Sequence, residues 1–424
     1  MTRRRTAIPW WPTLTESTAS AMRPRRKPSG FSLIEVLISM VLALITFLVM
    51  FQMFESWDRS RRSTASGGSA MVTGAMAMFR IERDLRLAGF GFGNATDLGC
   101  TVSVYDATRP DDAAAGAVSA TASNVFTFPL VALQIVNGNT DQIVTTYGSS
   151  EGISTTRFFG TSAAGAQPYT ALTSNSATME IGARGGIQQG DLVVIAQDSG
   201  ACNLVEVTDT SSTDRRTLSF TGGNFTHFYT AAVNTAPRYN DPGGLAASGA
   251  TGRVYVLGPG PQRRVWQIRN NRTLAYTNDF RWTDTTNNTT GAATADGAND
   301  FTDIADNIVN LQAEYGVATP AGSPAAPTCT PVNNPTWTSV APVTACQPFV
   351  WAVRVALLAR SDQFEKAAIT ATAPTWAGGG FTMTNLDGSA GNTVPTDPAQ
   401  DWRHYRYKVF ESIVPLKNVM WGSR

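Results

Sequence analysis

The most prominent pattern in the amino-acid sequence is an uninterrupted apolar segment close to its N-terminus. From Phe31 to Phe51 the chain has 21 residues with one charge, Glu35, and with neither proline nor glycine. A helix rises 1.5 Å per residue, so this segment spans roughly 30 Å, the thickness of the hydrocarbon core of a bilayer. A secretory signal peptide has a shorter apolar stretch and then a small-residue cleavage site, which does not follow here. The pattern predicts a membrane-spanning helix over residues 31–54.

The helical pattern continues over residues 55–95 in an amphipathic form. Apolar residues recur at steps of three and four, and we expect this stripe to pack against the protein's own sheet. Gly67 and Gly68 each cost about 1 kcal/mol relative to alanine and predict a bend or a melted turn, whereas Gly89 predicts the C-terminal cap. The stripe consists of Met71, Ala75, Met78, Ile81, Leu85 and Ala88, and the charged residues expected mostly on the other faces are Arg80, Arg83, Asp84 and Arg86.

Short β-type runs separated by glycine, serine, threonine, asparagine and alanine dominate residues 96–424. The turn-rich segments between most runs favour antiparallel sheets, and the chain as a whole is predicted to have an α+β fold with a long N-terminal helix packed on these sheets. Asp303–Leu311 is predicted to be a short helix, and residues 318–348, with seven prolines, an irregular insertion. The predicted strands are Asn124–Phe128, Val131–Val136, Asp141–Thr146, Asp191–Ala196, Leu204–Thr208, Arg253–Leu257, Val265–Arg269, Thr273–Thr277, Gln312–Val317, Val350–Arg360 and Tyr405–Val414.

Composition adds an asymmetry of charge. The formal net charge is +1, but residues 1–30 hold seven of the 33 basic residues and only one of the 32 acidic residues, so the remainder of the chain carries −5. This balance excludes a nucleic-acid binder that works by bulk charge, because phosphate neutralisation needs a basic face. Basic residues lie on both sides of the apolar segment, so the positive-inside rule favours a cytoplasmic N-terminus only modestly.

Glu35 is a costly residue in its position, because a carboxylate in hydrocarbon costs about 2.5 kcal/mol or more. It therefore needs a place near the interface, a proton or a partner. Ser32-x-x-Glu35 before an apolar run matches the capping box, which ties down the unpaired N–H groups at the start of a helix. The residues in front of the segment provide a second, compatible explanation.

A basic leader that ends in glycine precedes the segment: Arg25-Arg26-Lys27-Pro28-Ser29-Gly30, followed by Phe31-Ser32-Leu33-Ile34-Glu35. This arrangement resembles the processing site of the type IV prepilin family. The resemblance implies that a membrane aspartyl peptidase, the prepilin peptidase, removes residues 1–30 by cutting after Gly30 and methylates the new amine of Phe31. Cleavage leaves a cation at the start of an apolar helix. Glu35 of a neighbouring subunit would pair with this cation and fix the register of bundled helices.

Four further blocks resemble the minor-pilin family PilW, namely Leu85–Gly93, Asp303–Val317, Val350–Ser361 and His404–Trp421. The resemblance implies a structural protein, without catalytic activity or cofactor, that helps to prime type IV pilus assembly with other minor pilins, the major pilin and a tip adhesin. It also implies an inner-membrane protein with a periplasmic head that reaches the cell surface in the pilus, where adhesion and twitching motility take place. Pseudopilins of type II secretion share the N-terminal signature and form the first alternative.

The four cysteines indicate disulfides in a domain exported to an oxidising compartment, and four cysteines allow three connectivities. Cys329 and Cys346 flank the proline-rich insertion, and a bridge between them closes a loop of about 18 residues, worth roughly 3 kcal/mol in the chain-entropy model. Cys100 would then pair with Cys202. A zinc site is not expected, because the chain has no C-x-x-C pair and only two histidines.

Three other motifs give weaker signals. Gly148–Gly152 has the G-x-S-x-G pattern of a nucleophile elbow around Ser150, which makes a membrane-tethered serine hydrolase the second alternative, but the β-branched residues that follow favour a turn over the required helix. Gly89–Gly93 lacks the lysine of a P-loop. A group of acids does not keep the EF-hand spacing, so a solvated loop and helix start is expected there and calcium binding is the alternative. These acids are Asp296, Asp300, Asp303 and Asp306.

Overall fold

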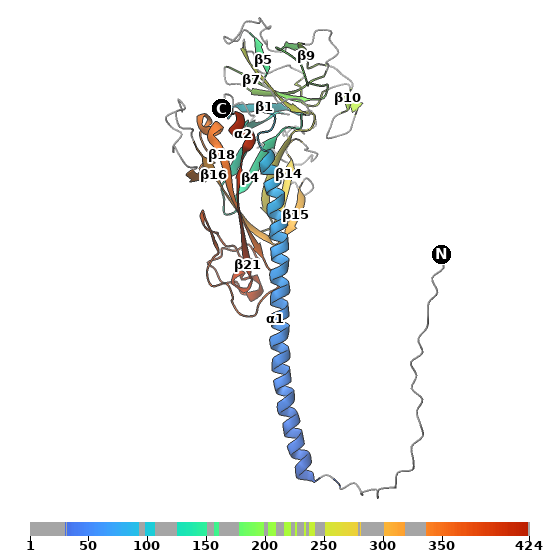
Figure 1. Ribbon diagram of the computed structural model, residues 1–424, viewed down its shortest axis with the longest axis vertical. Helices are drawn as coiled ribbons and strands as arrows, with labels where there is room; N and C mark the ends of the chain where they lie inside the picture. Colours follow the sequence, from blue (N-terminus) through green and yellow to red (C-terminus); the bar gives the residue numbers. More distant parts are fainter. Residues whose placement is uncertain are drawn as a thin grey trace, which may run out of the picture. The chain divides into compact units, whose positions relative to one another are not determined.

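The computed structural model describes residues 30, 32–92, 98–106, 125–150, 157–160, 178–198, 202–208, 216–221, 225–226, 233–234, 237–241, 251–278, 280, 301–318 and 336–422. The chain divides into two compact units, Met1–Arg61 and Arg62–Arg424. Helix α1 (Leu33–Leu87), drawn in blue in Figure 1, begins in the first unit and ends in the second. The helix is continuous through Gly67 and Gly68, so the predicted bend is wrong. The cost of about 1 kcal/mol per glycine is small beside the many backbone hydrogen bonds of a 55-residue helix.

Three larger sheets and three pairs of short strands account for the strands among the described residues. In spatial order, the first sheet is β2 (Val125–Pro129), β1 (Thr101–Tyr105), β8 (Cys202–Glu206), β7 (Leu192–Gln197), β12 (Thr251–Gly258) and β5 (Arg157–Gly160). The second is β15 (Thr302–Asp306), β14 (Thr273–Asn278), β13 (Gln262–Arg269), β4 (Gln142–Tyr147) and β3 (Leu133–Val136). The third is β17 (Thr336–Thr338), β16 (Ile308–Val317), β18 (Val350–Arg360) and β21 (Tyr407–Pro415).

The remaining described elements are short. The strand pairs are β6 (Thr178–Glu180) with β9 (Thr217–Ser219), β10 (Phe225–Thr226) with β11 (Val233–Asn234), and β19 (Thr375–Trp376) with β20 (Gly379–Gly380). Three 3₁₀ turns, η4 (Thr344–Phe349), η5 (Pro398–Gln400) and η6 (Trp402–His404), precede the final helix α2 (Lys417–Gly422). The described strand pairs are antiparallel except β1 with β8, which is parallel, so the predicted α+β fold with antiparallel sheets is confirmed with one exception.

The position of strand β18 between two cores explains why its sequence is a nearly continuous apolar run. Val353, Val355 and Leu357 belong to the main core, which also includes the buried side of α1, whereas Ala356 and Leu358 belong to a second core on the opposite face. Residues 361–406 provide the cover for this second face through side chains such as Phe381. A strand buried on both faces does not show the alternation of a half-exposed strand.

The segment Asp303–Leu311, predicted to be a helix, is instead divided between two strands. Residues of β15 pair with β14, and β16 starts at Ile308 and pairs with β18. Asn307 lies between them with a φ of 59°, a left-handed conformation that asparagine tolerates better than most residues. Cross-strand pairing therefore overrides the local helical spacing here. The strand β1 was not anticipated either.

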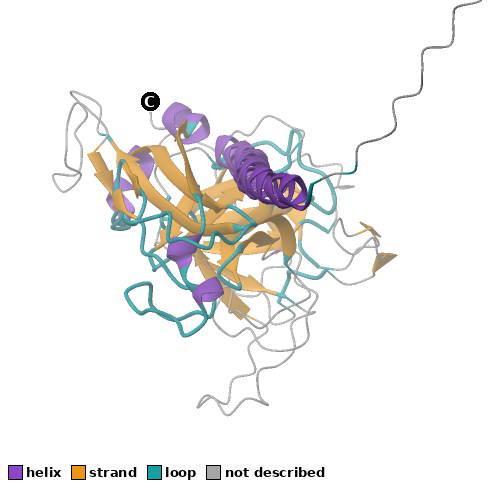
Figure 2. Ribbon diagram, turned by 90° about the horizontal axis from the view of Figure 1, so that it is seen from below, coloured by secondary structure: helices purple, strands orange, loops and turns teal. Residues whose placement is uncertain are grey.

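One side of the second half of α1 lies against the strands (Figure 2). Met78, Ile81, Leu85 and Ala88 are buried as predicted, whereas Met71 and Ala75 of the predicted stripe are exposed. At its start the buried stripe instead contains three small residues, Ala70, Gly74 and Ala77. A side chain at Gly74 would collide with the ring of Phe410 on β21, so glycine permits the helix to approach this strand closely. The buried stripe consists of Ala70, Gly74, Ala77, Met78, Ile81, Leu85 and Ala88.

Asp84, expected on a solvent-exposed face, is 2% exposed and is the polar centre of this contact. Its two carboxylate oxygens accept hydrogen bonds from Nη1 of Arg264 at 2.9 and 3.0 Å, and Nε1 of Trp266 donates to Oδ2 at 3.0 Å. The hydroxyl of Tyr147 donates to Oδ1 at 3.3 Å. Burial lowers the pKa of the Arg264 guanidinium, but Asp84 together with Tyr147 and Tyr276 more than offsets this effect, so the pKa is raised above its usual value.

The helix ends where the sequence predicts a cap. Gly89 has a φ of 82°, and its N–H donates to the carbonyl oxygen of Thr146 at 2.8 Å. The side chain of Asn418 in α2 donates to the carbonyl oxygens of Leu87 and Ala88, each at 3.2 Å. The last carbonyl groups of the helix, which have no partner within it, thereby obtain donors from elsewhere in the fold.

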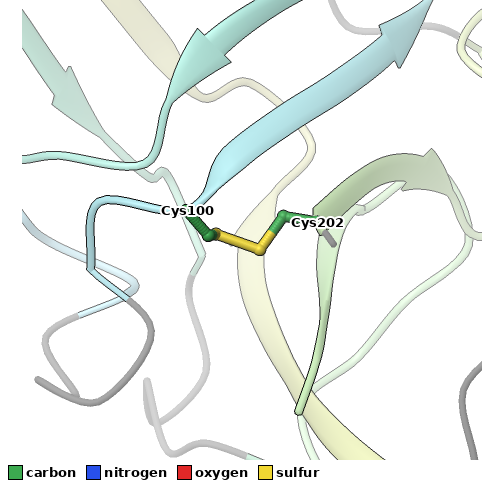
Figure 3. The surroundings of a disulfide bond; sticks show 2 residues. All are labelled: Cys100 and Cys202. Carbon is green, nitrogen blue, oxygen red and sulfur yellow. A yellow bond between two sulfur atoms is a disulfide. The ribbon is translucent and has the colours of Figure 1, made fainter. Parts of the chain in front are cut away.

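The disulfide between Cys100 and Cys202 confirms the pairing predicted for these two cysteines. It joins the residue before β1 to the first residue of β8, where the two strands run parallel (Figure 3). The two cysteines are 102 residues apart in the sequence. Cys346 also forms a disulfide, and Cys329, its predicted partner, lies outside the described residues.

Replacing Asp84 by asparagine keeps its shape but removes the charge that faces Arg264. We expect Asp84→Asn to lower the free energy of unfolding by about 3 kcal/mol, at the low end of the range for broken buried ion pairs because Arg264 is partly exposed. Denaturant unfolding of the full chain in detergent, followed by tryptophan fluorescence, measures the change. Glu365→Gln removes an exposed pair with Arg406 and should cost less than about 1 kcal/mol. Equal losses in the two variants would contradict the role given to Asp84.

Removal of the Cys100–Cys202 bridge should cost more than removal of the other predicted bridge. In the chain-entropy model a loop of this length contributes about 4.7 kcal/mol, against about 3 kcal/mol for the loop between Cys329 and Cys346. Paired Cys→Ser variants, unfolded under the same conditions, measure the two costs. Non-reducing peptide mapping of the wild-type protein should recover both linkages, and a free thiol at Cys100 or Cys202 would refute the first.

Candidate processing and assembly segment

The predicted cleavage site lies immediately before α1. Gly30 is exposed, and no described atom beyond its neighbours lies within 4 Å of the position that a Cβ would occupy. Phe31 and residues 1–29 of the predicted leader lie outside the described residues. The described part of the site is therefore open to another protein on the carbonyl side of the bond between Gly30 and Phe31.

Ser32 forms the start of the helix. Its carbonyl oxygen accepts hydrogen bonds from the N–H groups of Glu35 at 3.0 Å and Val36 at 3.1 Å, which places Ser32 at the N-cap position. Glu35 is exposed in the first turn, where the unpaired N–H groups at a helix N-terminus favour a negative charge. Its place in the first turn is compatible with both sequence interpretations, the local cap and the pair with a neighbour's amine.

Leu33–Asp58 is the one helical segment of the described residues that is long and apolar enough to cross a membrane. Its large apolar side chains are all exposed, with values from 49% at Val49 to 79% at Leu33. The hydroxyls of Ser39 and Thr46 donate to carbonyl oxygens of Val36 and Leu42 in the same helix, at 2.9 and 2.7 Å, and so need no outside partner. Over residues 33–51, Glu35 is thus the one charged side chain, on a surface whose Ser39 and Thr46 hydroxyls are hydrogen-bonded within the helix.

The far end of this apolar segment has the residues of a membrane interface. Phe54 and Trp57 form an edge-to-face pair with ring centroids 6.2 Å apart. The guanidinium carbon of Arg61 lies 4.9 Å from the centroid of the Trp57 ring. Tryptophan and arginine are favoured at the level of the lipid headgroups, because each has an apolar body and a polar end.

The second half of α1 also leaves apolar side chains uncovered. Val72, Met76 and Phe79 are between 59% and 69% exposed, although the helix is docked on the strands by its other side. We call these three residues the outer apolar face. Met71, predicted to lie in the buried stripe, is 53% exposed at the edge of that stripe, where it lines a pocket with residues of β21 such as Tyr407.

The residues of the hydrolase alternative do not form a catalytic arrangement in the described part of the chain. Ser150 is 8% exposed and follows β4 in a turn, and Glu151 and Gly152 lie outside the described residues. The Nδ1 atom of His404 is hydrogen-bonded to the carbonyl oxygen of Glu365 at 2.7 Å. His227 lies outside the described residues.

The acids considered for calcium are only partly described. Asp303 forms an ion pair with Arg269 at 3.5 Å, and Asp306 accepts a hydrogen bond from Thr273 at 3.2 Å, while Asp296 and Asp300 lie outside the described residues. Among the described residues, no three metal-binding side chains are grouped closely enough to hold an ion.

Comparison with family models gives two matches, one near the N-terminus of the chain and one toward its C-terminus. The prokaryotic N-terminal methylation motif matches residues 25–51, which include Gly30, Phe31 and Glu35. The model of type IV pilus-assembly protein W matches residues 277–418, which include β15, β16, β18 and β21. Comparison with curated proteins and with solved structures gave no match. The processing motif and the C-terminal strands together identify the chain as a PilW-like pilin, a minor pilin of type IV pilus assembly.

Proposed function

We propose that this minor pilin is matured by cleavage after Gly30 and methylation of Phe31, and that it enters the pilus through α1. In this proposal prepilin peptidase removes the basic leader, the helix holds the protein in the inner membrane, and the head folds in the periplasm. The match of residues 25–51 to the methylation motif and the exposure of Gly30 support the first step. The disulfide between Cys100 and Cys202 supports an oxidising compartment for the head.

The observation that carries the proposal is the exposed apolar surface of α1 in both units. Hydrophobic stabilisation is about 25 cal/mol per Å² of apolar surface removed from water, so such a surface needs either lipid or protein around it. Lipid is a suitable cover for Leu33–Asp58 before assembly. The outer apolar face lies in the second unit on a helix that carries charged residues such as Arg80, so neighbouring helices of a filament are its more suitable cover.

Glu35 is the residue to which we assign the register of assembly. Cleavage after Gly30 creates an amine four residues before this carboxylate, and both charges are costly in hydrocarbon. A pair between the amine of one subunit and Glu35 of its neighbour satisfies both groups and allows one axial position of the two helices. The cap at Ser32 leaves the carboxylate of Glu35 exposed for this purpose.

The partners that follow are proposed from chemistry and from the family. Prepilin peptidase acts on the leader, and other minor pilins, the major pilin and a tip adhesin contact the assembled subunit. The processing motif alone suits a type II secretion pseudopilin equally well, but the match over residues 277–418 is to a pilus-assembly protein. The pilus is therefore the filament that we assign.

The first prediction concerns maturation. The mature N-terminus should be N-methylated Phe31, and Gly30→Ala should leave the leader attached, because a side chain at this position hinders the peptidase. Terminal sequencing by mass spectrometry of the membrane and pilus fractions checks both. An intact leader in wild-type cells, or a mature terminus after Phe51, would show that the N-terminal segment has another role.

The second prediction separates anchoring from assembly. Glu35→Ala should be inserted and cleaved about as well as the wild type, because loss of a charge makes the helix more apolar. Its incorporation should fall by more than a factor of ten, because an unpaired buried charge costs roughly 3 to 5 kcal/mol and 1.4 kcal/mol corresponds to a factor of ten. The measurement is the ratio of pilus-associated to membrane-retained protein.

Two further variants serve as controls for Glu35. Glu35→Gln retains shape and hydrogen bonding but not charge, and should fail in the same way as Glu35→Ala. Ser32→Ala removes a cap, at a cost nearer to about 1 kcal/mol, and should have a much smaller effect. If both Glu35 variants assemble normally, the charge pair between subunits does not exist and Glu35 is only a cap.

A further inference from the structure

A groove between α1 and the second sheet carries positive charge that the described part of the chain does not neutralise. We call this cavity of about 340 Å³ the arginine groove. One wall is the helix, and the other is formed by β4, β13, β14 and β15 with the turns that follow β4 and precede β13. The lining residues used in the argument are Arg80, Arg83, Ser149, Arg264 and Tyr276.

The charges of the arginine groove are unequal. Its lining holds three arginines and one acid, Asp84. The carboxylate of Asp84 is already hydrogen-bonded to Arg264 and Trp266. Arg80 and Arg83 are exposed, and neither has an ion-pair or hydrogen-bond partner in the part of the chain that the structure describes. Two guanidinium groups, on adjacent turns of one helix, therefore lie at the groove without an acceptor.

Arg86 shows that the lack of an acceptor is not a general property of the exposed arginines of α1. It is also exposed, but its Nη2 atom lies 3.0 Å from Oε2 of Glu82 in the same helix, and it does not line the groove. Three successive arginines on the exposed side thus fall into two classes. Arg86 has a carboxylate from its own chain, and the two in the groove do not.

The chemistry of the arginine groove fits a carboxylate. A guanidinium offers a planar fork of N–H donors that matches the two oxygens of a carboxylate, and such charge-assisted hydrogen bonds are about twice as strong as neutral ones. The hydroxyl oxygen of Ser149 accepts a hydrogen bond from the N–H of Gly260 at 2.7 Å, so its hydrogen is available to an incoming oxygen. The volume is at the lower end of the range of ligand sites and suits one or two side chains.

The position of the arginine groove indicates where the carboxylate comes from. Arg80 directly follows Phe79 of the outer apolar face, which is 65% exposed. A subunit that covers Met76 and Phe79 thus lies against the helix at the point where Arg80 and Arg83 need an acceptor. The surface of the neighbouring subunit must then provide both apolar side chains that cover the outer apolar face and an acidic side chain for the groove.

We propose that the arginine groove receives an acidic side chain, aspartate or glutamate, from a neighbouring pilin subunit and so selects which subunit packs against this face. The inference rests on the proposed function and adds the chemistry of the partner. Glu35 would set the axial position of neighbouring helices, and the groove would discriminate between neighbours, because like charges placed at Arg80 and Arg83 are repelled.

A double neutralisation tests the groove. Arg80→Gln/Arg83→Gln should reduce the ratio of pilus-associated to membrane-retained protein about tenfold, which is the effect of two partly exposed ion pairs. Arg86→Gln is the matched control, because it neutralises an arginine of the same helix outside the groove, and it should assemble as the wild type does. Thermal unfolding of the full chain in detergent should be the same for the double variant and the control.

A charge exchange identifies the partner. A photo-crosslinking amino acid at position 83 should attach to another pilin subunit close to an aspartate or glutamate. Changing that acid to lysine should restore the incorporation of Arg83→Glu, and should not restore that of Glu35→Ala. Crosslinking alone does not support the proposal, and rescue by the exchanged charge does.

Several results would overturn the inference while the proposed function stands. If wild type enters the pilus and the double variant enters equally well, the groove does not take part in assembly. If the crosslinked surface has no acid, or if charge exchange fails to rescue, the occupant is not an acidic side chain. If acetate titrated onto the full chain in detergent binds through Arg80 and Arg83 while incorporation is unaffected, the groove is a small-anion site. Failure of wild type to enter pili would instead refute the proposed function itself.

Discussion

The buried carboxylate of Asp84 is the interaction on which the arrangement of the helix depends. A charge removed from water needs partners of fixed geometry, and Asp84 finds them on two strands, β4 and β13. Ile81 and Leu85 are fully buried, but apolar contacts are compatible with some sliding, whereas the hydrogen bonds allow one rotation and one height of the helix. The same bonds therefore determine which residues point outward, so the outer apolar face and the arginine groove both follow from the position of Asp84.

Periodicity was sufficient to predict the elements that bury side chains in a regular way. The membrane-spanning segment, the amphipathic helix and most of the longer strands were found from apolar spacing, because each of them buries a local stripe. The segment Asp303–Leu311 was misassigned because its helical spacing is real but two neighbouring strands compete for its backbone. The predicted bridge between Cys100 and Cys202 brings the segments of β1 and β8 together, but their parallel pairing was not predicted, because β1 was not recognised as a strand and a disulfide does not specify strand direction.

The residues of the candidate site also differ in how far the sequence alone reveals them. Gly30, Phe31 and Glu35 form a motif within six residues, so the proposed processing site could be recognised from the sequence directly, and the methylation motif matches the same residues. Asp84 was assigned to the solvent because a charge within a helix usually lies there, and only the fold brings Arg264 to it. The arginine groove combines residues between positions 80 and 304, and the lack of partners for Arg80 and Arg83 among the described residues becomes visible only once the fold places those residues.

The contact between α1 and β21 has a consequence for the order of folding. Glu82 accepts a hydrogen bond from the hydroxyl of Ser412, which follows it by 330 residues, and the ring of Phe410 covers Gly74. At a synthesis rate of about 5 to 20 residues per second, the helix emerges roughly 15 to 70 seconds before this strand. During that interval the part of the inner side that faces β21, around Gly74, is uncovered even though β4 and β13 have already emerged, and it can attract chaperones or premature partners. Once β21 is in place it covers this part of the helix, so a nascent chain and a folded subunit present different apolar surfaces to the same membrane.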